Sequence, residues 1–199
     1  ISIVSVIGIT LGVWALILTM SIMNGFRLEL VSKIIGFEPH AYVDTRGLPM
    51  SEVEQIEQDL LQRSEVISVE PIIEATALAT AYRRSEGVQV RGVRPADLRN
   101  NELIREGRES LLERRPEIGT LDTFGAGEGL SKDIVIGSAF ANALTITVGD
   151  PLTLTQPNGA RTIGGATART RVFNVSAIYH VGDERYDRYA LFLPIDSAR

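Results

Sequence analysis

The sequence has no cysteine and only two histidines, and these absences narrow the chemistry that it can support. Without thiols there are no disulfides, no zinc ribbon and no cysteine nucleophile, and the redox compartment stays undecided. The sequence contains no block of Lys or Arg, and its 20 basic residues are outnumbered by 25 acidic ones, which gives a net charge of −5. It therefore lacks the basic surface that is typical of a nucleic-acid-binding protein. No Gly-Lys-Ser or Gly-Lys-Thr follows the glycine-rich stretch 125–129, which we interpret as a flexible connector instead of a phosphate-binding loop.

Charge is also missing from the start of the chain, where no ionisable side chain precedes Arg27. A helix of about 20 apolar residues crosses a hydrocarbon layer of roughly 30 Å, and the run ISIVSVIGITLGVWALILTMSIM is long enough to do so. A signal peptide lacks support because there is no basic segment before the run and no convincing small-residue cleavage site. A buried core helix is the other alternative, and the length of the run argues against it. We therefore predict a transmembrane helix over residues 1–26.

Two features of this helix bear on its surroundings. Gly8 and Gly12 form a G-x-x-x-G motif, which lets a second helix approach closely in lipid, although the motif is short and also arises by chance. Apolar residues continue after Arg27 with charges interleaved, so we expect the helix to leave the bilayer as a stalk over residues 27–38. Its end is predicted near Gly36 and Pro39.

Residues 39–93 are predicted to form an α+β part in which one helix covers a small sheet. Ser51 and Glu54 have the spacing of a capping box, which places the start of a helix that runs through Arg63. The expected strands are 40–44, 66–69 and 72–82, and a polar turn at 83–87 leads back into a hairpin partner at 88–93.

Residues 94–199 are predicted to form a second, mainly β part. Its expected helices are 102–113 and 138–144, and its expected strands are 134–137, 152–155, 171–179 and 189–193. The stretch 156–170 interrupts this part between two strands and contains several glycines, arginines and no acidic residue. We interpret it as a protruding, locally basic arm, and a plain solvated loop remains the alternative.

The sequence offers little for catalysis. His40 and His180 have no ligand partner at helical spacing, and each is interpreted as a histidine at a strand end. Ser138 follows Gly137 but lacks the glycine spacing of a nucleophile elbow. The charged run 183–188 is interpreted as a solvated turn with paired charges, without the pattern of a calcium loop. We predict no catalytic residue, no metal site and no cofactor.

Several segments resemble the LolC/LolE family of lipoprotein-releasing permeases. The first is Gly8-Ile9-Thr10-Leu11-Gly12-Val13, followed by Ser21-Ile22-Met23-Asn24-Gly25-Phe26-Arg27 and then Glu29-Leu30. The likeness resumes around Ile136-Gly137-Ser138 with Ala141 and Leu144, at Val148-Gly149-Asp150, and at Val172-Phe173-Asn174-Val175. It covers most of the chain in order and is weakest over 94–130.

The resemblance implies a permease subunit of an ABC transporter in the inner membrane of a Gram-negative bacterium, with the residues after 26 in the periplasm. It implies a MacB-like periplasmic domain made of a porter-like βαβ part and a β-rich second part. The implied partners are a separate ATPase subunit, a second permease subunit of the same or a related type, a periplasmic chaperone and lipoprotein substrates. Such a subunit is no enzyme itself. The chain would begin inside the first helix and stop before the second half of the porter-like part.

The same resemblance implies two binding sites. The arm matches a hook that captures the chaperone, and its implied contact residues are Thr162, Ile163, Gly164, Gly165, Arg169 and Arg171. The family often has proline where Ile163 and Ala168 stand. Near the periplasmic end of the helix, the residues implied to line a lipoprotein cavity are Met20, Met23, Asn24 and Phe26.

Two other functions remain open on the residues alone. One is a mechanotransmission permease of the MacB or FtsX type, and the other is a single-pass, membrane-anchored sensor or binding module. Three further hydrophobic segments in the complete gene would reject the sensor, and their absence would reject the permease.

Overall fold

Two compact units make up the chain, Ile1–Val43 and Asp44–Arg199. The computed structural model describes residues 2–35, 39–113, 115, 117–126, 130–157, 161–162, 165–166 and 168–198. The residues from Gly36 to Glu38, at the predicted end of the stalk, and most of the connector 125–129 lie outside the described part of the chain.

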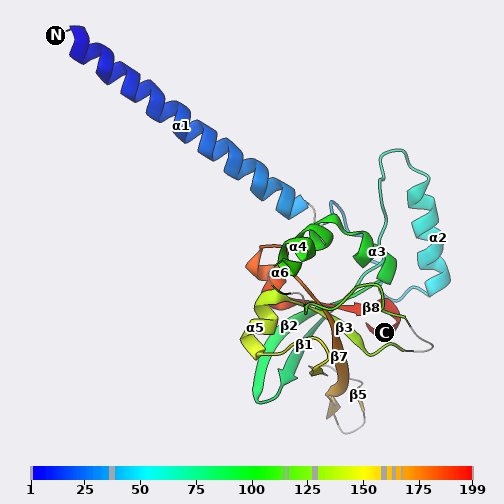
Figure 1. Cartoon of the computed structure of the whole chain (residues 1–199). Helices are drawn as coiled ribbons and strands as arrows, with labels where there is room; N and C mark the ends of the chain where they lie inside the picture. Colours follow the sequence, from blue (N-terminus) through cyan, green and yellow to red (C-terminus); the bar gives the residue numbers. More distant parts are fainter. Residues whose placement is uncertain are drawn as a thin grey trace. The chain divides into compact units, whose positions relative to one another are not determined.

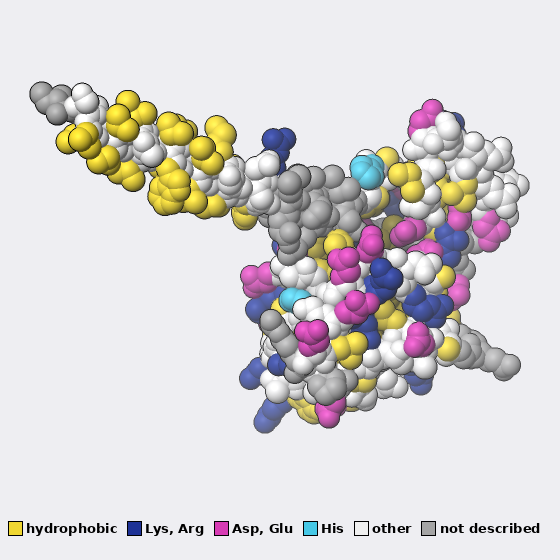
Figure 2. All heavy atoms as spheres, turned by 45° about the horizontal axis from the view of Figure 1, so that its top comes forward, with side chains coloured by type: hydrophobic (Ala, Val, Ile, Leu, Met, Phe, Trp, Pro, Cys, Tyr) yellow, Lys and Arg dark blue, Asp and Glu magenta, His cyan; other side chains and the backbone are white. Residues whose placement is uncertain are grey.

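The first unit contains one long helix, α1, which spans Ser2–Ile35. Residues 2–27 have a mean hydropathy of 2.3 and are long and apolar enough to cross a membrane. Figure 2 shows apolar side chains along this part of the helix. The apolar helix that we predicted is present, and residues 2–27 of it are a candidate membrane span. The helix continues past Arg27 to Ile35, as predicted.

The second unit is built on a closed barrel of six strands in the order β1-β2-β8-β3-β7-β4. The strands are β1 Ile73–Ala81, β2 Arg84–Val93, β3 Asp133–Gly137, β4 Pro151–Gln156, β7 Arg169–Tyr179 and β8 Ala190–Pro194. The pairs β2–β8 and β3–β7 are parallel and the other four pairs are antiparallel. The barrel is therefore mixed, which agrees with the predicted α+β class.

Burial along the strands follows from what covers each face. In β1, Ala77, Ala79 and Ala81 are buried and alternate with more exposed residues, as expected for a strand with one face toward a core. By contrast, β8 is buried along its whole length. The largest fully buried barrel side chains are Ile134, Val135, Ile136, Leu152, Val175, Tyr179 and Leu191.

Short helices flank the barrel. They are α3 Pro95–Asn100, α4 Glu102–Leu112, α5 Ser138–Leu144, α6 Glu184–Tyr189 and α7 Ile195–Ala198. In Figure 1, α4, α5 and α6 gather along one side of the strands. α4 begins at a cap in which the Asn101 side chain accepts a hydrogen bond from the amide of Ile104 at 3.1 Å. This side of the barrel is where the polar contacts described below converge.

Helix α2, Met50–Leu61, is tied to α3 through one arginine. The Arg94 guanidinium contacts Glu57 of α2 at 2.6 Å and Asp97 of α3 at 3.0 Å, and it also donates to the carbonyl of Val69 at 3.2 Å. The predicted helix at this place is confirmed. The predicted capping box is wrong: the cap residue is Pro49, which has no side-chain acceptor, and Ser51 already lies inside the first turn.

Three other local predictions differ from the structure. The segments 40–44 and 66–69 are not strands, since neither has a ladder partner among the described residues. The β1–β2 hairpin turns over Tyr82 and Arg83 alone, because Ala81 pairs with Arg84, and the polar stretch 84–87 belongs to β2. Tyr82 adopts the positive φ, 52°, that a two-residue hairpin turn requires.

The sheet also connects segments that we assigned to different parts of the chain. β2 pairs with β8, and β1 pairs with β4, so strands from 73–93 and from 94–199 share one barrel. The separate porter-like part over 39–93 and second part over 94–199 stay a prediction of how the chain is organised.

Candidate functional site

The arm leaves the barrel between β4 and β7. These strands pair up to Gln156 opposite Arg169, which fixes where the inserted stretch begins and ends. Within it, β5 Arg161–Thr162 pairs with β6 Gly165–Ala166, and Thr162 lies opposite Gly165. In Figure 1, β5 lies beyond one end of the barrel. Of the predicted contact residues, Ile163 and Gly164 lie outside the described residues.

A cavity of about 70 Å³ lies at the base of the arm. Its walls are inward-facing residues of five barrel strands together with residues of α7. Ala77, Val90, Leu154, Phe173 and Leu193 form its buried apolar part.

The arm base supplies the polar rim of this cavity. Gln156 ends β4, and Arg169 and Arg171 begin β7, so the pair that closes the arm also borders the cavity. Arg169 is exposed and Arg171 is half-buried. Thus two of the residues predicted to contact a chaperone, Arg169 and Arg171, lie together at the rim.

Helix α7 is held against this end of the barrel by three contacts. Arg171 donates from Nη1 to the carbonyl of Ser197 at 2.9 Å, and the Ser197 hydroxyl donates to the carbonyl of Ser131 at 2.7 Å. Gly92 of β2 leaves no room for a side chain, because an added Cβ would overlap that of Ala198. The close approach at Gly92 therefore lets α7 cover part of the barrel end.

The residues predicted in the membrane helix lie on its surface in the structure. The exposed fractions of Met20, Met23 and Phe26 are 69%, 62% and 60%. Gly8 and Gly12 have open space around the position of a Cβ. Their roles in a lipoprotein cavity and in helix packing stay predictions.

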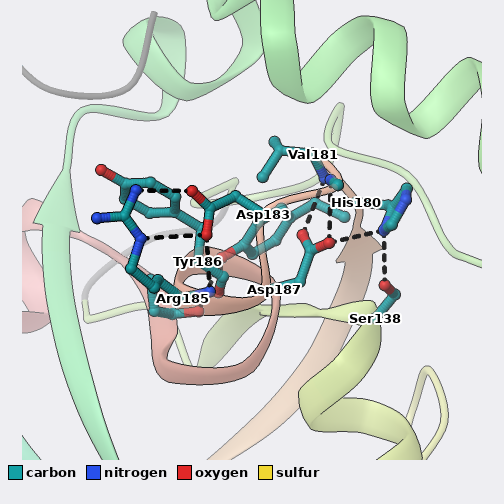
Figure 3. A network of polar contacts seen from close by, with 10 residues as sticks. Ser138, His180, Val181, Asp183, Arg185, Tyr186 and Asp187 are labelled. Atoms are coloured by element: carbon teal, nitrogen blue, oxygen red, sulfur yellow. Dashed lines mark hydrogen bonds and ion pairs between the residues drawn. The ribbon is translucent and has the colours of Figure 1, made fainter. Parts of the chain in front are cut away.

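A separate network joins Ser138, His180 and Asp187 (Figure 3). His180 follows the last residue of β7, Ser138 begins α5, and Asp187 lies in α6. The Nδ1 atom of His180 lies 3.0 Å from the Ser138 Oγ and 2.7 Å from the Asp187 Oδ2. The predicted position of His180 at a strand end is confirmed, whereas His40 has no strand beside it among the described residues.

This network has the composition of a catalytic triad without its geometry. In a triad the histidine takes the serine proton at one ring nitrogen, while the acid accepts a hydrogen bond from the other nitrogen and orients the ring. Here Ser138 and Asp187 share the same nitrogen, Nδ1. We therefore interpret the network as a structural junction between α5, α6 and the end of β7.

Asp187 corrects the interpretation of 183–188 as a solvated turn. These residues form most of α6, and the Asp187 side chain is 4% exposed. Its carboxylate accepts hydrogen bonds from the amides of Val181 at 2.8 Å and Gly182 at 3.0 Å. Burial raises the pKa of the Asp187 carboxyl, and these two amides together with His180 oppose the rise. The mixed charges of 183–188 do not distinguish Asp187 from its exposed neighbours in the sequence. Only the fold shows that Asp187 is buried.

Helix α4 meets the same junction through Gly107 and Arg108. A Cβ on Gly107 would overlap the carbonyl oxygen of His180 and lie 2.6 Å from its carbon. The buried Arg108 donates to the carbonyls of Ile178 and Gly119, each at 2.7 Å, and burial lowers the pKa of its guanidinium. The first bond satisfies a buried carbonyl near the end of β7, and the second satisfies a carbonyl of the segment that follows α4.

Among the residues that the structure describes, no three His, Asp or Glu side chains are grouped so that they could hold a metal ion. The barrel and its arm remain the most distinctive features.

Comparison with known proteins identifies the domain. Residues 2–199 match the MacB-like periplasmic core domain. The chain is 29% identical over 188 residues to the lipoprotein-releasing system transmembrane protein LolC of Xylella fastidiosa, covering 94% of this chain and 43% of that protein. It is 28% identical over 206 residues to LolE of Haemophilus influenzae, covering 98% of this chain and 45% of that protein. The chain thus spans less than half the length of these curated relatives.

A solved structure is also similar. The periplasmic region of MacB from Actinobacillus actinomycetemcomitans covers 72% of this chain and 55% of its own, with 12% identity and a TM-score of 0.40. The family match spans the apolar helix and the barrel unit together. The chain therefore belongs to the family of MacB-like periplasmic core domains.

Proposed function

We propose that the chain is the amino-terminal part of an ABC transporter permease that releases lipoproteins from the inner membrane of a Gram-negative bacterium and passes them to a periplasmic chaperone. The observation that carries the proposal is the arm inserted between β4 and β7, in a chain that aligns over 94% and 98% of its length with LolC and LolE proteins. A separate subunit would hydrolyse ATP, and a second permease subunit of the same or a related type would complete the membrane part.

In this proposal each unit has a mechanical role. Helix α1 anchors the barrel unit in the membrane, and residues after 26 lie in the periplasm. Met20, Met23, Asn24 and Phe26 help to line the lipoprotein cavity, where flexible thioether side chains suit varied acyl chains. Gly8 and Gly12 allow close packing against another membrane helix.

The arm would capture the chaperone. Its short β5–β6 hairpin extends beyond the paired strands, and Arg169 and Arg171 add positive charge at its base. Two guanidinium groups on one strand favour a partner with carboxylates on its facing surface.

Replacing the arm tests the proposal. Because Gln156 pairs with Arg169, residues 157–168 can be replaced by Asn-Gly, which closes a two-residue hairpin at that register. The full chain, purified in nanodiscs, is assayed for binding to the lipoprotein chaperone encoded in the same genome. We expect binding to be lost while the thermal midpoint of the barrel stays unchanged.

A matched control replaces Tyr82-Arg83, the two-residue turn of the β1–β2 hairpin, by the same Asn-Gly. This control should bind the chaperone as the parent chain does. Undiminished binding after replacement of the arm would contradict its assignment as the capture element.

A further inference from the structure

The cavity at the arm base has the size and lining of a receptor for one aliphatic side chain. An apolar cavity of about 150 Å³ holds a benzene molecule, so a cavity of about 70 Å³ holds roughly three or four carbon atoms. This volume matches the end of a Leu, Ile or Met side chain. A lipid acyl chain is several times longer and would leave most of its length outside.

The rim adds a charge preference. Gln156, Arg169 and Arg171 border the opening, and no acidic residue lines the cavity among the described residues. One Nη of Arg171 already donates to the Ser197 carbonyl, which fixes that guanidinium beside the opening. A carboxylate next to the inserted aliphatic group would meet two cations whose positions are set by β7.

The cavity lies directly beside the base of the arm. The pair Gln156–Arg169 both closes the arm and borders the cavity, so a protein held by the arm lies over the opening. Buried pockets at the centre of a contact are where a few side chains supply most of the affinity.

We infer that this cavity receives an aliphatic side chain, flanked by a carboxylate, of the protein that the arm captures. The inference rests on the proposed function and adds to it a second, apolar anchor. The arm would supply reach and orientation, and the anchor would slow dissociation.

Filling the cavity tests the inference. Ala75 of β1 lines the opening, and Ala75→Leu adds an isopropyl group that occupies the space of the incoming side chain. We expect chaperone binding by the full chain in nanodiscs to weaken at least tenfold, with a thermal midpoint equal to or above that of the parent. Thr76→Leu is the matched control, because Thr76 is exposed on the next position of the same strand and does not line the cavity. It should change the affinity less than twofold.

The outcomes separate the two proposals. If replacement of the arm abolishes binding while Ala75→Leu binds as the parent chain does, the anchor is refuted and the proposed function stands. If replacement of the arm leaves binding unchanged, the proposed function itself fails. Should Ala75→Leu fail to fold, Ala75→Met fills the cavity with a more flexible side chain and carries the same expectation.

A lipid occupant is tested directly. The fluorescent fatty acid cis-parinarate is titrated into the chain without chaperone, held in an amphipathic polymer. Saturable binding that Ala75→Leu abolishes would show an acyl chain in the cavity and would overturn the inference. Absence of such binding, together with the tenfold loss of chaperone affinity, supports it.

Discussion

Gly107→Ala tests how closely α4 must approach the end of β7. The added Cβ would overlap the carbonyl oxygen of His180 and lie 2.6 Å from its carbonyl carbon, where the ordinary contact distance begins at 3.4 Å. Both atoms belong to backbone, so no side-chain rotation relieves the overlap, and α4 must move away from the barrel.

The movement also breaks polar contacts. Arg108 follows on the same helix, and its bonds to the carbonyls of Ile178 and Gly119 are both 2.7 Å. Overpacking costs about 1–3 kcal/mol, and each lost hydrogen bond to a charged group about 1.5–3 kcal/mol. The better helix propensity of alanine returns at most about 1 kcal/mol. We expect a net loss of at least about 3 kcal/mol in the free energy of unfolding, which lowers the midpoint by at least about 6 °C.

The assay is thermal unfolding of the full chain in detergent, followed by near-UV circular dichroism, to which the fully buried Tyr179 contributes. Gly87→Ala is the matched control, because an added Cβ on this β2 glycine meets nothing within 4 Å. It should unfold at or above the temperature of the parent chain. A midpoint for Gly107→Ala within about 2 °C of the parent's corresponds to a loss far below the expected one and would refute the packing argument.

Two further predictions concern carboxylates. Asp187→Ala leaves the ring of His180 and two backbone amides without their acceptor, and we expect a loss of about 1–3 kcal/mol by denaturant unfolding, because water reaches His180 and Gly182 and replaces part of the lost bonds. Exposed Glu184→Ala should cost under about 0.5 kcal/mol. Hydrogen bonds from Thr147 lower the pKa of Asp150 below 3.8. Its contribution to stability is therefore complete above pH 3.8 and is lost as the pH falls through the lowered folded-state value. Asp150→Asn should flatten the pH dependence of the unfolding midpoint in that acid range, and an unchanged slope would count against the role of Thr147.

Patterns along the chain were sufficient to predict its longer helices and most strands, but not the short helices α3, α6 and α7. The apolar run before Arg27 favours a nonpolar environment irrespective of the rest of the fold. The alternation of apolar and polar residues in 73–81 and 171–175 indicates strands with one buried face. The segments 40–44 and 66–69 have strand-like composition, but a strand also needs a partner, and composition does not supply one.

The absence of cysteine excluded disulfides and thiol chemistry from the sequence alone, and the uncharged start of the chain identified a candidate membrane-spanning helix. Only the tertiary structure decided that Asp187 is buried beneath His180, that Gly107 meets the end of β7, and that the arm base borders a cavity. The reason is physical: hydrophobic periodicity reports the solvent on each face of one element. Burial of a charge, close approach of two backbones and a pocket lined by several strands depend on elements far apart in the chain, here brought together when β7 pairs with both β3 and β4.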